Sequence, residues 1–349
     1  MGHSYRAVQW NRFKLRYDMA LIAGVVLFIA AFMGISAGVH PEATAETLLI
    51  RGLGLAAIVL LHVILAIGPL ARLDRRWLPL LYNRRHLGVT MAILAFIHGG
   101  FSILQFHAFG DTNPIVSLFT AGSGGDSISG FPFQPIGAAA LAIIVLMAAT
   151  SHDYWLANLT APVWKALHML VYLAYALVVL HVALGSLQVQ SHWAPAALLG
   201  VGVLGLGTLH TMAALQGRGP DLAVPEPSGE WVDVGSVSDV PEGRALAAMV
   251  AGERVAIYKN EGKLSAISGV CQHQNGPLAE GRIVDGLVVC PWHGFQYRPD
   301  CGKSPEPFHE TVPTFRLEVR GGRVLVQTMP LPLGTTTEPV PATLEDSAP

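Results

Sequence analysis

Two neighbouring segments decide the fold of the C-terminal part: CQHQNGPLAEG at residues 271–281 and CPWHGFQYRPDCG at residues 290–302. Their metal-ligating side chains follow the spacing Cys-x-His, sixteen residues, then Cys-x-x-His. Each segment offers one thiolate and one imidazole, so two loops can clamp one metal centre between them. Gly276, Pro277 and Gly294 suit the tight turns that bring such loops together. The expected ligands are Cys271, His273, Cys290 and His293.

Two kinds of centre use two cysteines and two histidines. In a Rieske-type [2Fe–2S] cluster, two Cys thiolates hold one iron and two His imidazoles hold the other. A zinc site can have the same ligands, but zinc fingers use a wider His spacing and a helix after the second Cys. Here Pro and Gly flank both ligand pairs, and Trp292 and Phe295 are placed to shield the centre. The pattern therefore favours the iron–sulfur cluster.

Short alternating runs typical of β-strands surround the two loops and predict an all-β domain at residues 231–329. The runs lie at 232–237, 254–258, 263–267, 287–290 and 315–327. Gly321-Gly322 in the last run is a two-residue hairpin signal. Residues 218–230 (RGPDLAVPEPSGE) are rich in Pro and Gly and predict a linker. Residues 330–349 have no periodicity, and we expect a disordered tail there.

The segment from about 230 to 328 resembles the ferredoxin-type Rieske domains of bacterial oxygenase systems, whose second box also reads CPWHG. Rieske proteins of the cytochrome bc type carry an extra disulfide between the cluster loops. This chain has only three cysteines, and neither loop holds a Cys beyond its ligand unless Cys301 counts. The resemblance implies a low potential, near the bottom of the range of about −150 to +300 mV for Rieske centres. We expect Cys301 to be a packed thiol, and the unpaired cysteine favours a reducing compartment.

The rest of the chain has the composition of a membrane protein. The 349 residues are 52% hydrophobic and 13% charged, whereas a soluble domain has about 25% charged residues. Residues 1–217 carry a net charge of +4, and residues 218–349 carry −6. We therefore expect a membrane domain followed by an acidic soluble domain. Neither part has a basic patch suited to nucleic acid.

Six apolar runs are long enough, at about 20 residues each, to cross a lipid bilayer. They lie at 18–38, 50–71, 87–107, 135–151, 165–186 and 194–215. The predicted fold is a membrane all-α six-helix bundle in residues 1–217, followed by the all-β domain. Cationic residues gather in the N-terminal segment and in alternate loops, and the opposite loops are acidic. We therefore expect both termini and the cluster domain on the cytoplasmic side of the cell (inner) membrane.

Histidines inside the apolar spans are candidate haem ligands. Ionisable groups are costly in a bilayer, and imidazole is the usual axial ligand when a helical bundle holds haem. His86 and His168 lie near the cytoplasmic end of two spans, and His98 and His181 lie 12 and 13 residues further on, about 18–20 Å along a helix. The pattern predicts one or two b-type haems. Because 12 or 13 residues do not return to the same helix face, the two histidines of one helix project from different faces. Each haem would therefore have to approach the helices from a different side.

Residues 50–186 are similar to the ferric reductase-like transmembrane domain. This family includes ferric reductases, NADPH oxidases and the haem-binding membrane subunit of the bacterial methionine sulfoxide reductase system. The likeness rests on GPLARL at 68–73, on RRHLG at 84–88 followed by His98, and on WKALHMLVYLAYALVVLH at 164–181.

The resemblance implies that His98, His168 and His181 bind haem. It supports His86 less directly, because the methionine sulfoxide reductase relatives usually have no His after the Arg pair. His62 lies near mid-membrane and is an alternative partner for the outer haem.

Ferric reductases and NADPH oxidases carry a flavin module after the sixth span, and here the cluster domain takes its place. No G-x-G-x-x-G fingerprint follows a strand; GVGVLGLG at 200–207 lies inside an apolar span. The chain also lacks a nucleophile–base pair, so whether it is an oxidoreductase or only an electron-transfer component stays open.

We expect single electrons to pass from a cytoplasmic donor reductase through the cluster to haem and on to an external acceptor. Two alternatives stay open. One is a membrane-anchored ferredoxin that supplies a cytoplasmic oxygenase or reductase. The other is quinol-linked electron transfer in the inward direction.

Overall fold

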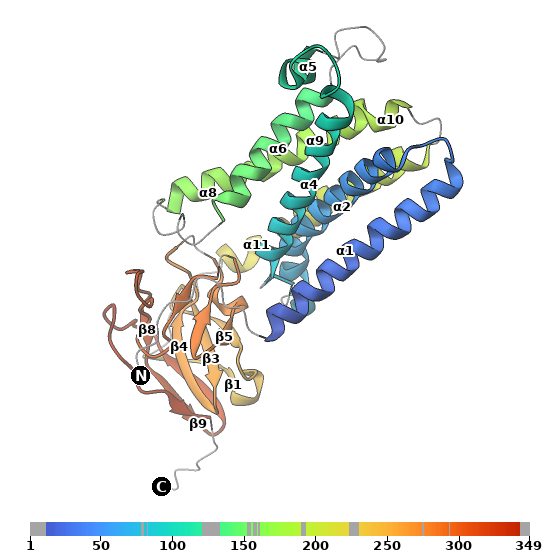
Figure 1. The fold of residues 1–349 in the computed structure, drawn as a ribbon. Helices are drawn as coiled ribbons and strands as arrows, with labels where there is room; N and C mark the ends of the chain where they lie inside the picture. The colour runs from blue at the N-terminus through green and yellow to red at the C-terminus, as the bar shows by residue number, and fades with distance from the viewer. Residues whose placement is uncertain are drawn as a thin grey trace. The chain divides into compact units, whose positions relative to one another are not determined.

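The computed structural model describes most of the chain, in ranges separated by short gaps (Figure 1). These are residues 12–77, 80–81, 83–120, 133–151, 155, 159, 161–189, 193–222, 230–273, 276–292 and 294–342. The chain forms two compact units. The first is helical and comprises residues 8–77 and 83–214, and the second contains the β domain in residues 215–349.

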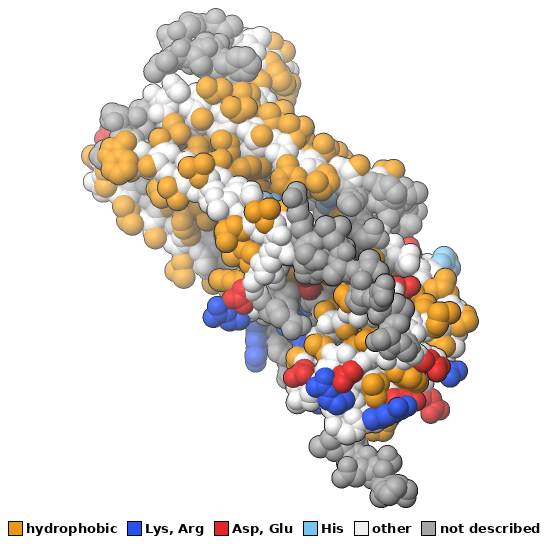
Figure 2. Space-filling view, turned by 180° about the vertical axis from the view of Figure 1, so that it is seen from behind, with side chains coloured by type: hydrophobic (Ala, Val, Ile, Leu, Met, Phe, Trp, Pro, Cys, Tyr) orange, Lys and Arg blue, Asp and Glu red, His pale blue; other side chains and the backbone are white. Residues whose placement is uncertain are grey.

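The helical unit consists of helices whose sequences are apolar around most of their circumference. The longer helices are α1 (Arg12–Val39), α2 (Ala45–Leu73), α4 (Arg84–His107), α6 (Phe133–Ala149), α8 (Ala161–Met169), α9 (Val171–Leu184) and α11 (Ala194–Leu222). Three shorter pieces are η1 (Arg75–Trp77), α5 (Pro114–Thr120) and α10 (Ser186–Val189). Hydrophobic side chains cover the visible face of this unit, whereas charged side chains gather mostly on the β unit (Figure 2). An apolar exterior of this kind is what lipid requires.

Within the described residues, five helical segments are long and apolar enough to cross a membrane. They are Lys14–Val39, Ala45–Leu73, Arg84–His107, Ala166–Gln188 and Ala194–Gln216. The six-helix bundle is therefore not confirmed in number. The fourth predicted span corresponds to α6, which has only 17 residues. At its end, the hydroxyls of Thr150 and Ser151 donate back to the carbonyls of Leu146 and Met147, both at 2.7 Å, and the helix stops there.

The helices pack mainly as two neighbouring pairs, α2 with α4 and α6 with α9. In each pair, the second helix follows the first along the chain and returns against it (Figure 1). The predicted fifth span is divided at Leu170 into α8 and α9. The last helix, α11, continues to Leu222 and so extends into the predicted linker. Residues 223–229 of that linker lie outside the described residues.

The second unit is the expected all-β domain. Its strands are β1 (Trp231–Ser236), β2 (Ala245–Val250), β3 (Glu253–Asn260), β4 (Lys263–Ser268), β5 (Arg282–Val284), β6 (Leu287–Val289), β7 (Gln296–Tyr297), β8 (Thr314–Phe315), β9 (Leu317–Arg320), β10 (Arg323–Gln327) and β11 (Val340–Pro341). They form the sheets β1-β10-β9, β11-β4-β3-β2 with β8 beside β4, and β5-β6-β7. The Gly321-Gly322 hairpin is confirmed: both glycines have positive φ, and Arg320 pairs with Arg323.

The C-terminal segment differs from the predicted disordered tail. Residues 330–342 run across the domain, and β11 pairs antiparallel with β4. The amides of Leu331, Thr337 and Ala342 donate to the carbonyls of Thr314, Asp300 and Gly262 at 2.8, 2.7 and 2.8 Å. Residues 343–349 lie outside the described residues.

Candidate functional site

The small sheet β5-β6-β7 positions the two cysteine-containing loops. The first loop precedes β5, and the second joins β6 to β7. Each loop is closed in the same way, because its cysteine amide donates to the carbonyl five residues later. Cys271 N donates to Gly276 O at 2.9 Å, and Cys290 N donates to Phe295 O at 2.7 Å. Each cysteine is therefore fixed at the first position of a tight loop, and each is only 1% exposed.

The two loops face each other. A Cβ atom added at Gly276 would lie 2.7 Å from Cys290 Sγ and 3.4 Å from the Trp292 ring. Glycine is thus the residue that lets the sulfur of the second loop approach the backbone of the first. The His273 ring of the first loop stacks on the Phe295 ring of the second, with ring centres 5.1 Å apart and planes 1° apart. Phe295 and Trp292, the aromatic residues expected to shield the centre, pack with the two buried cysteines.

Three of the four predicted cluster ligands lie in this buried region. His273 is 3% exposed, and none of the three cysteines, all within the described residues, forms a disulfide. The fourth predicted ligand, His293, lies outside the described residues. Without it, the described part of the chain holds no group of three or more His, Cys, Asp or Glu side chains placed to bind a metal ion.

Tyr297 is a contact of the site that the motif alone did not reveal. Its hydroxyl oxygen accepts from the Gln272 amide at 3.0 Å and lies 3.3 Å from Cys271 Sγ. Burial, and then the negative charge of a Cys271 thiolate, raise the pKa of Tyr297. The phenol therefore keeps its proton and can donate it to the sulfur. Alternation along β7 is the sequence signal, because Phe295 and Tyr297 are two residues apart and share a face.

Tyr258 lies in the same hydrophobic cluster as both cysteines. Its hydroxyl donates to the carbonyl of Leu278. Burial, and then the negative charge of a Cys290 thiolate, raise the pKa of Tyr258. Arg244 lowers the pKa of Tyr258, but burial outweighs its charge, so both tyrosines are neutral under ordinary conditions.

In the helical unit, one predicted haem pair is brought together. The ring centres of His98 in α4 and His181 in α9 are 6.4 Å apart, and their planes cross at 83°. His98 Nδ1 donates to Ile50 O at 2.9 Å, and His181 Nδ1 donates to Phe133 O at 2.9 Å. A carbonyl can only accept, so each ring carries its proton on Nδ1 and keeps Nε2 as a lone-pair donor. This is the arrangement in which ligating histidines are normally held.

The other predicted pair is placed differently. His86 Nδ1 lies 2.7 Å from Asp18 Oδ1, a hydrogen bond that ties α4 to α1. The ring of His168 stacks on Trp164 with centres 3.4 Å apart. Its Nδ1 donates to Trp164 O at 3.1 Å, and its Nε2 lies 3.3 Å from Ser151 Oγ. Among the described residues, no ring contact joins His86 to His168.

His62 has a partner that its sequence position did not suggest. Its Nδ1 donates to Ile58 O of its own helix at 2.9 Å, so its Nε2 accepts from the Tyr175 hydroxyl at 3.0 Å. Both ring nitrogens are therefore in hydrogen bonds, and the structure does not place this ring in the His98–His181 pair.

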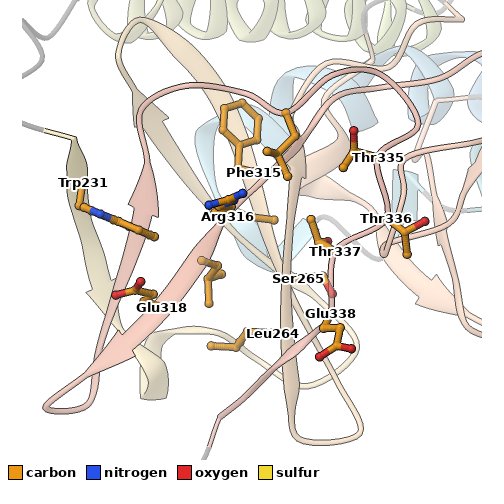
Figure 3. A pocket seen from close by; sticks show the side chains of 13 residues that line it. Trp231, Leu264, Ser265, Phe315, Arg316, Glu318, Thr335, Thr336, Thr337 and Glu338 are labelled. Atoms are coloured by element: carbon orange, nitrogen blue, oxygen red, sulfur yellow. The ribbon is translucent and has the colours of Figure 1, made fainter.

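A cavity of about 300 Å³ lies elsewhere in the β domain (Figure 3). It is bordered by Trp231, Arg316 and Glu318 on one side and by Thr335 and Thr337 of the C-terminal segment on another. No residue of the two cysteine loops lines it, so it is separate from the candidate metal centre.

Comparisons with known proteins cover both units. Residues 53–179 match the ferric reductase like transmembrane component, and residues 230–316 match the Rieske [2Fe-2S] domain. The ferredoxin component of the alkene monooxygenase system from Xanthobacter autotrophicus (strain ATCC BAA-1158 / Py2) is 38% identical over 104 residues, 30% of this chain and 85% of that protein. The chain belongs to the Rieske family through its C-terminal domain. A ferric reductase-like membrane domain precedes it in the same chain.

Other relatives match the Rieske domain as well. The ferredoxin component of the naphthalene 1,2-dioxygenase system from Pseudomonas aeruginosa is 26% identical over 98 residues, 28% of this chain and 94% of that protein. Among solved structures, the ferredoxin of carbazole 1,9a-dioxygenase from Nocardioides aromaticivorans IC177 matches at 23% identity with a TM-score of 0.28. That match covers 29% of this chain and 100% of the other.

The family and the local structure agree on the kind of metal centre. A Rieske [2Fe-2S] domain requires thiolates on one iron and imidazoles on the other. The two buried thiols and the glycine that admits Cys290 Sγ fit that requirement. This Rieske domain, together with the ferric reductase-like membrane domain, makes the chain a membrane protein of electron transfer.

Proposed function

We propose that this chain relays single electrons between a cytoplasmic donor reductase and an external acceptor or quinone, using the cluster of its Rieske domain and b-type haem in its membrane domain. Cys271, Cys290, His273 and His293 would hold the [2Fe–2S] cluster, and His98 and His181 would hold haem. When bound, these groups supply one-electron carriers. The chain's own residues supply ligands, burial and hydrogen bonds.

The observation that carries the haem assignment is the geometry of His98 and His181. Two Nε2 atoms bonded to one iron at about 2 Å each place the two imidazole centres roughly 6 Å apart. The observed separation is 6.4 Å. Both Nδ1 atoms are already held by backbone carbonyls, so the rings are prepared to bind without moving far.

A second haem at His86 and His168 stays a prediction. Asp18 would then orient the His86 ring, as a carboxylate does for a ligating imidazole. Haem quantification per chain decides between one haem and two.

The test uses the purified full-length chain. We expect a b-type α-band in the reduced-minus-oxidised spectrum together with a Rieske EPR signal. His98→Ala and His181→Ala should each remove the haem bound by this pair and leave the Rieske signal intact. Cys290→Ser should do the reverse. A preparation that shows the Rieske signal but no α-band would overturn the relay.

One observation favours a second function, that of a membrane-anchored ferredoxin for an oxygenase or reductase. Two relatives of the Rieske domain are ferredoxin components, one of an alkene monooxygenase system and one of a naphthalene 1,2-dioxygenase system. In that case the haem-deficient variants would pass electrons from a soluble reductase to a soluble acceptor as fast as the wild type, with no transfer across the membrane.

A further inference from the structure

The two histidines of the His98–His181 pair sit in two copies of one local arrangement. His98 donates to the carbonyl of Ile50, and its ring lies against Gly54, four residues later in α2. His181 donates to the carbonyl of Phe133, and its ring lies against Gly137, four residues later in α6. In both copies the histidine comes 48 residues after the carbonyl it contacts. We call each carbonyl and its glycine a histidine seat.

The two seats have an explanation in the sequence. Every member of the second seat lies 83 residues after its counterpart in the first, without a gap. Other positions repeat at the same offset: Ala56 and Ala139, Ala57 and Ala140, Leu94 and Leu177, Leu104 and Leu187, and Gln105 and Gln188. The repeat coincides with the two helix pairs, α2 with α4 and α6 with α9. The bundle thus contains two copies of a two-helix unit, and each copy supplies one histidine to the pair.

Each seat needs glycine for a steric reason. A Cβ added at Gly137 would lie 2.5 Å from His181 Nδ1 and 2.7 Å from its Cε1. At Gly54 the added Cβ would lie 3.0 Å from His98 Cε1 and 3.1 Å from its Nδ1. In a helix, the residue four positions after a carbonyl normally covers the approach to that carbonyl. Glycine leaves the approach open, so a ring from the neighbouring helix can reach the oxygen.

The arrangement is specific to this pair among the membrane histidines. The His62 ring also lies against a glycine, Gly202, at 2.7 Å from an added Cβ. However, His62 Nδ1 donates to its own helix, and its Nε2 bonds Tyr175. In the repeat, the position equivalent to His62 is Val145. Both ring nitrogens of His62 are therefore used in hydrogen bonds between helices or within its own helix. In the two histidine seats, only Nδ1 is bonded to another described residue, and Nε2 of His98 and His181 can bind iron.

We propose that Gly54 and Gly137 are positioning residues for haem: together with the Ile50 and Phe133 carbonyls, they fix the tautomer and the crossed orientation of His98 and His181. The proposal rests on the proposed function, because it concerns haem bound by this pair. Each ring is fixed by its own copy of the repeat, and in that arrangement the two ring planes cross at 83°.

The test compares Gly137→Ala and Gly54→Ala with Gly100→Ala in the full-length protein. Gly100 lies two residues from His98 in the same helix, and an added Cβ there meets nothing within 4 Å, so it is the matched control. The readouts are haem affinity and the low-spin ferric EPR spectrum, whose anisotropy reports the angle between two axial imidazole planes. Circular dichroism and the Rieske EPR signal check that each variant is folded.

We expect Gly137→Ala to weaken haem affinity about 10-fold to 100-fold, as loss of a supporting contact to a ligand does. It should also shift the EPR signal away from the strongly anisotropic form that crossed planes give. Gly54→Ala should act in the same direction but less, because its added methyl has 0.5 Å more room. Gly100→Ala should match the wild type.

The outcomes separate this proposal from the one it rests on. A wild-type protein without haem would overturn the proposed function. If the wild type binds haem and both Gly54→Ala and Gly137→Ala keep its haem affinity and EPR spectrum, only the positioning role of the two glycines is overturned. If Gly137→Ala fails to fold, the milder Gly54→Ala decides by the same two readouts.

Discussion

A single hydroxyl is placed to tune the Rieske cluster. Tyr297 accepts from the Gln272 amide, so its own hydrogen points to the sulfur of Cys271, 3.3 Å away. An O–H donor stabilises negative charge on sulfur, and that charge grows when the cluster is reduced. The bond therefore favours the reduced form and raises the midpoint potential.

We predict that Tyr297→Phe lowers the midpoint potential of the cluster by roughly 40 mV, the equivalent of about 1 kcal/mol for one electron. Cluster content, measured by iron analysis, should be unchanged. Tyr258→Phe is the control, because that hydroxyl bonds a backbone carbonyl instead of a sulfur. Redox titration followed by EPR measures both variants. Equal potentials in wild type and Tyr297→Phe would contradict the assignment.

How far the sequence predicts a residue's role depends on whether its partner is local. The Cys and His spacing predicted the kind of metal centre. Of the two histidine pairs expected from the sequence, the structure brings the rings of His98 and His181 together, whereas within the described part of the chain no ring contact joins His86 to His168. The sequence did not show that Tyr297 meets Cys271, because 26 residues separate them. Nor did it show that His86 meets Asp18, 68 residues away. Such partners are set by packing.

Secondary structure was likewise predicted where it follows local sequence pattern and missed where it depends on distant partners. Strands around the cluster loops, the glycine hairpin and the long apolar helices follow local pattern and were predicted. The segment at 330–342 was not, because it is rich in Pro and Thr and lacks alternation. Its order comes from backbone hydrogen bonds to Thr314, Asp300 and Gly262, from the pairing of β11 with β4, and from Val340 and Ala342 packing on the core.

We predict that deleting residues 330–349 destabilises the Rieske domain. Each lost backbone hydrogen bond contributes about 1 kcal/mol, so a loss of 2 kcal/mol or more should lower the midpoint of thermal cluster loss by roughly 10 °C. Visible absorbance of the cluster in the full-length protein follows the transition. Deleting only residues 343–349 is the control, because it leaves the segment at 330–342 in place. Equal midpoints for the two deletions would show that the segment does not stabilise the domain.

The distribution of charge over the whole chain predicts which side of the membrane each part faces. The loop after the second span carries five arginines and one aspartate, the segment after the fourth carries Lys165 and Asp153, and the loop between the third and fourth spans carries only acidic charge. Cationic loops stay in the cytoplasm. Both termini, and with them the Rieske domain, would then be cytoplasmic, where a soluble reductase can reach the cluster.

Cysteine labelling tests this orientation directly. The three native cysteines are at most 4% exposed, so they react little with a bulky maleimide. Asp111 and Arg72 are exposed residues on opposite predicted sides. In right-side-out membrane vesicles, we expect Asp111→Cys to react with a membrane-impermeant maleimide, and Arg72→Cys to react only after permeabilisation. The reverse pattern would put the Rieske domain outside, and electrons would then have to enter from that side.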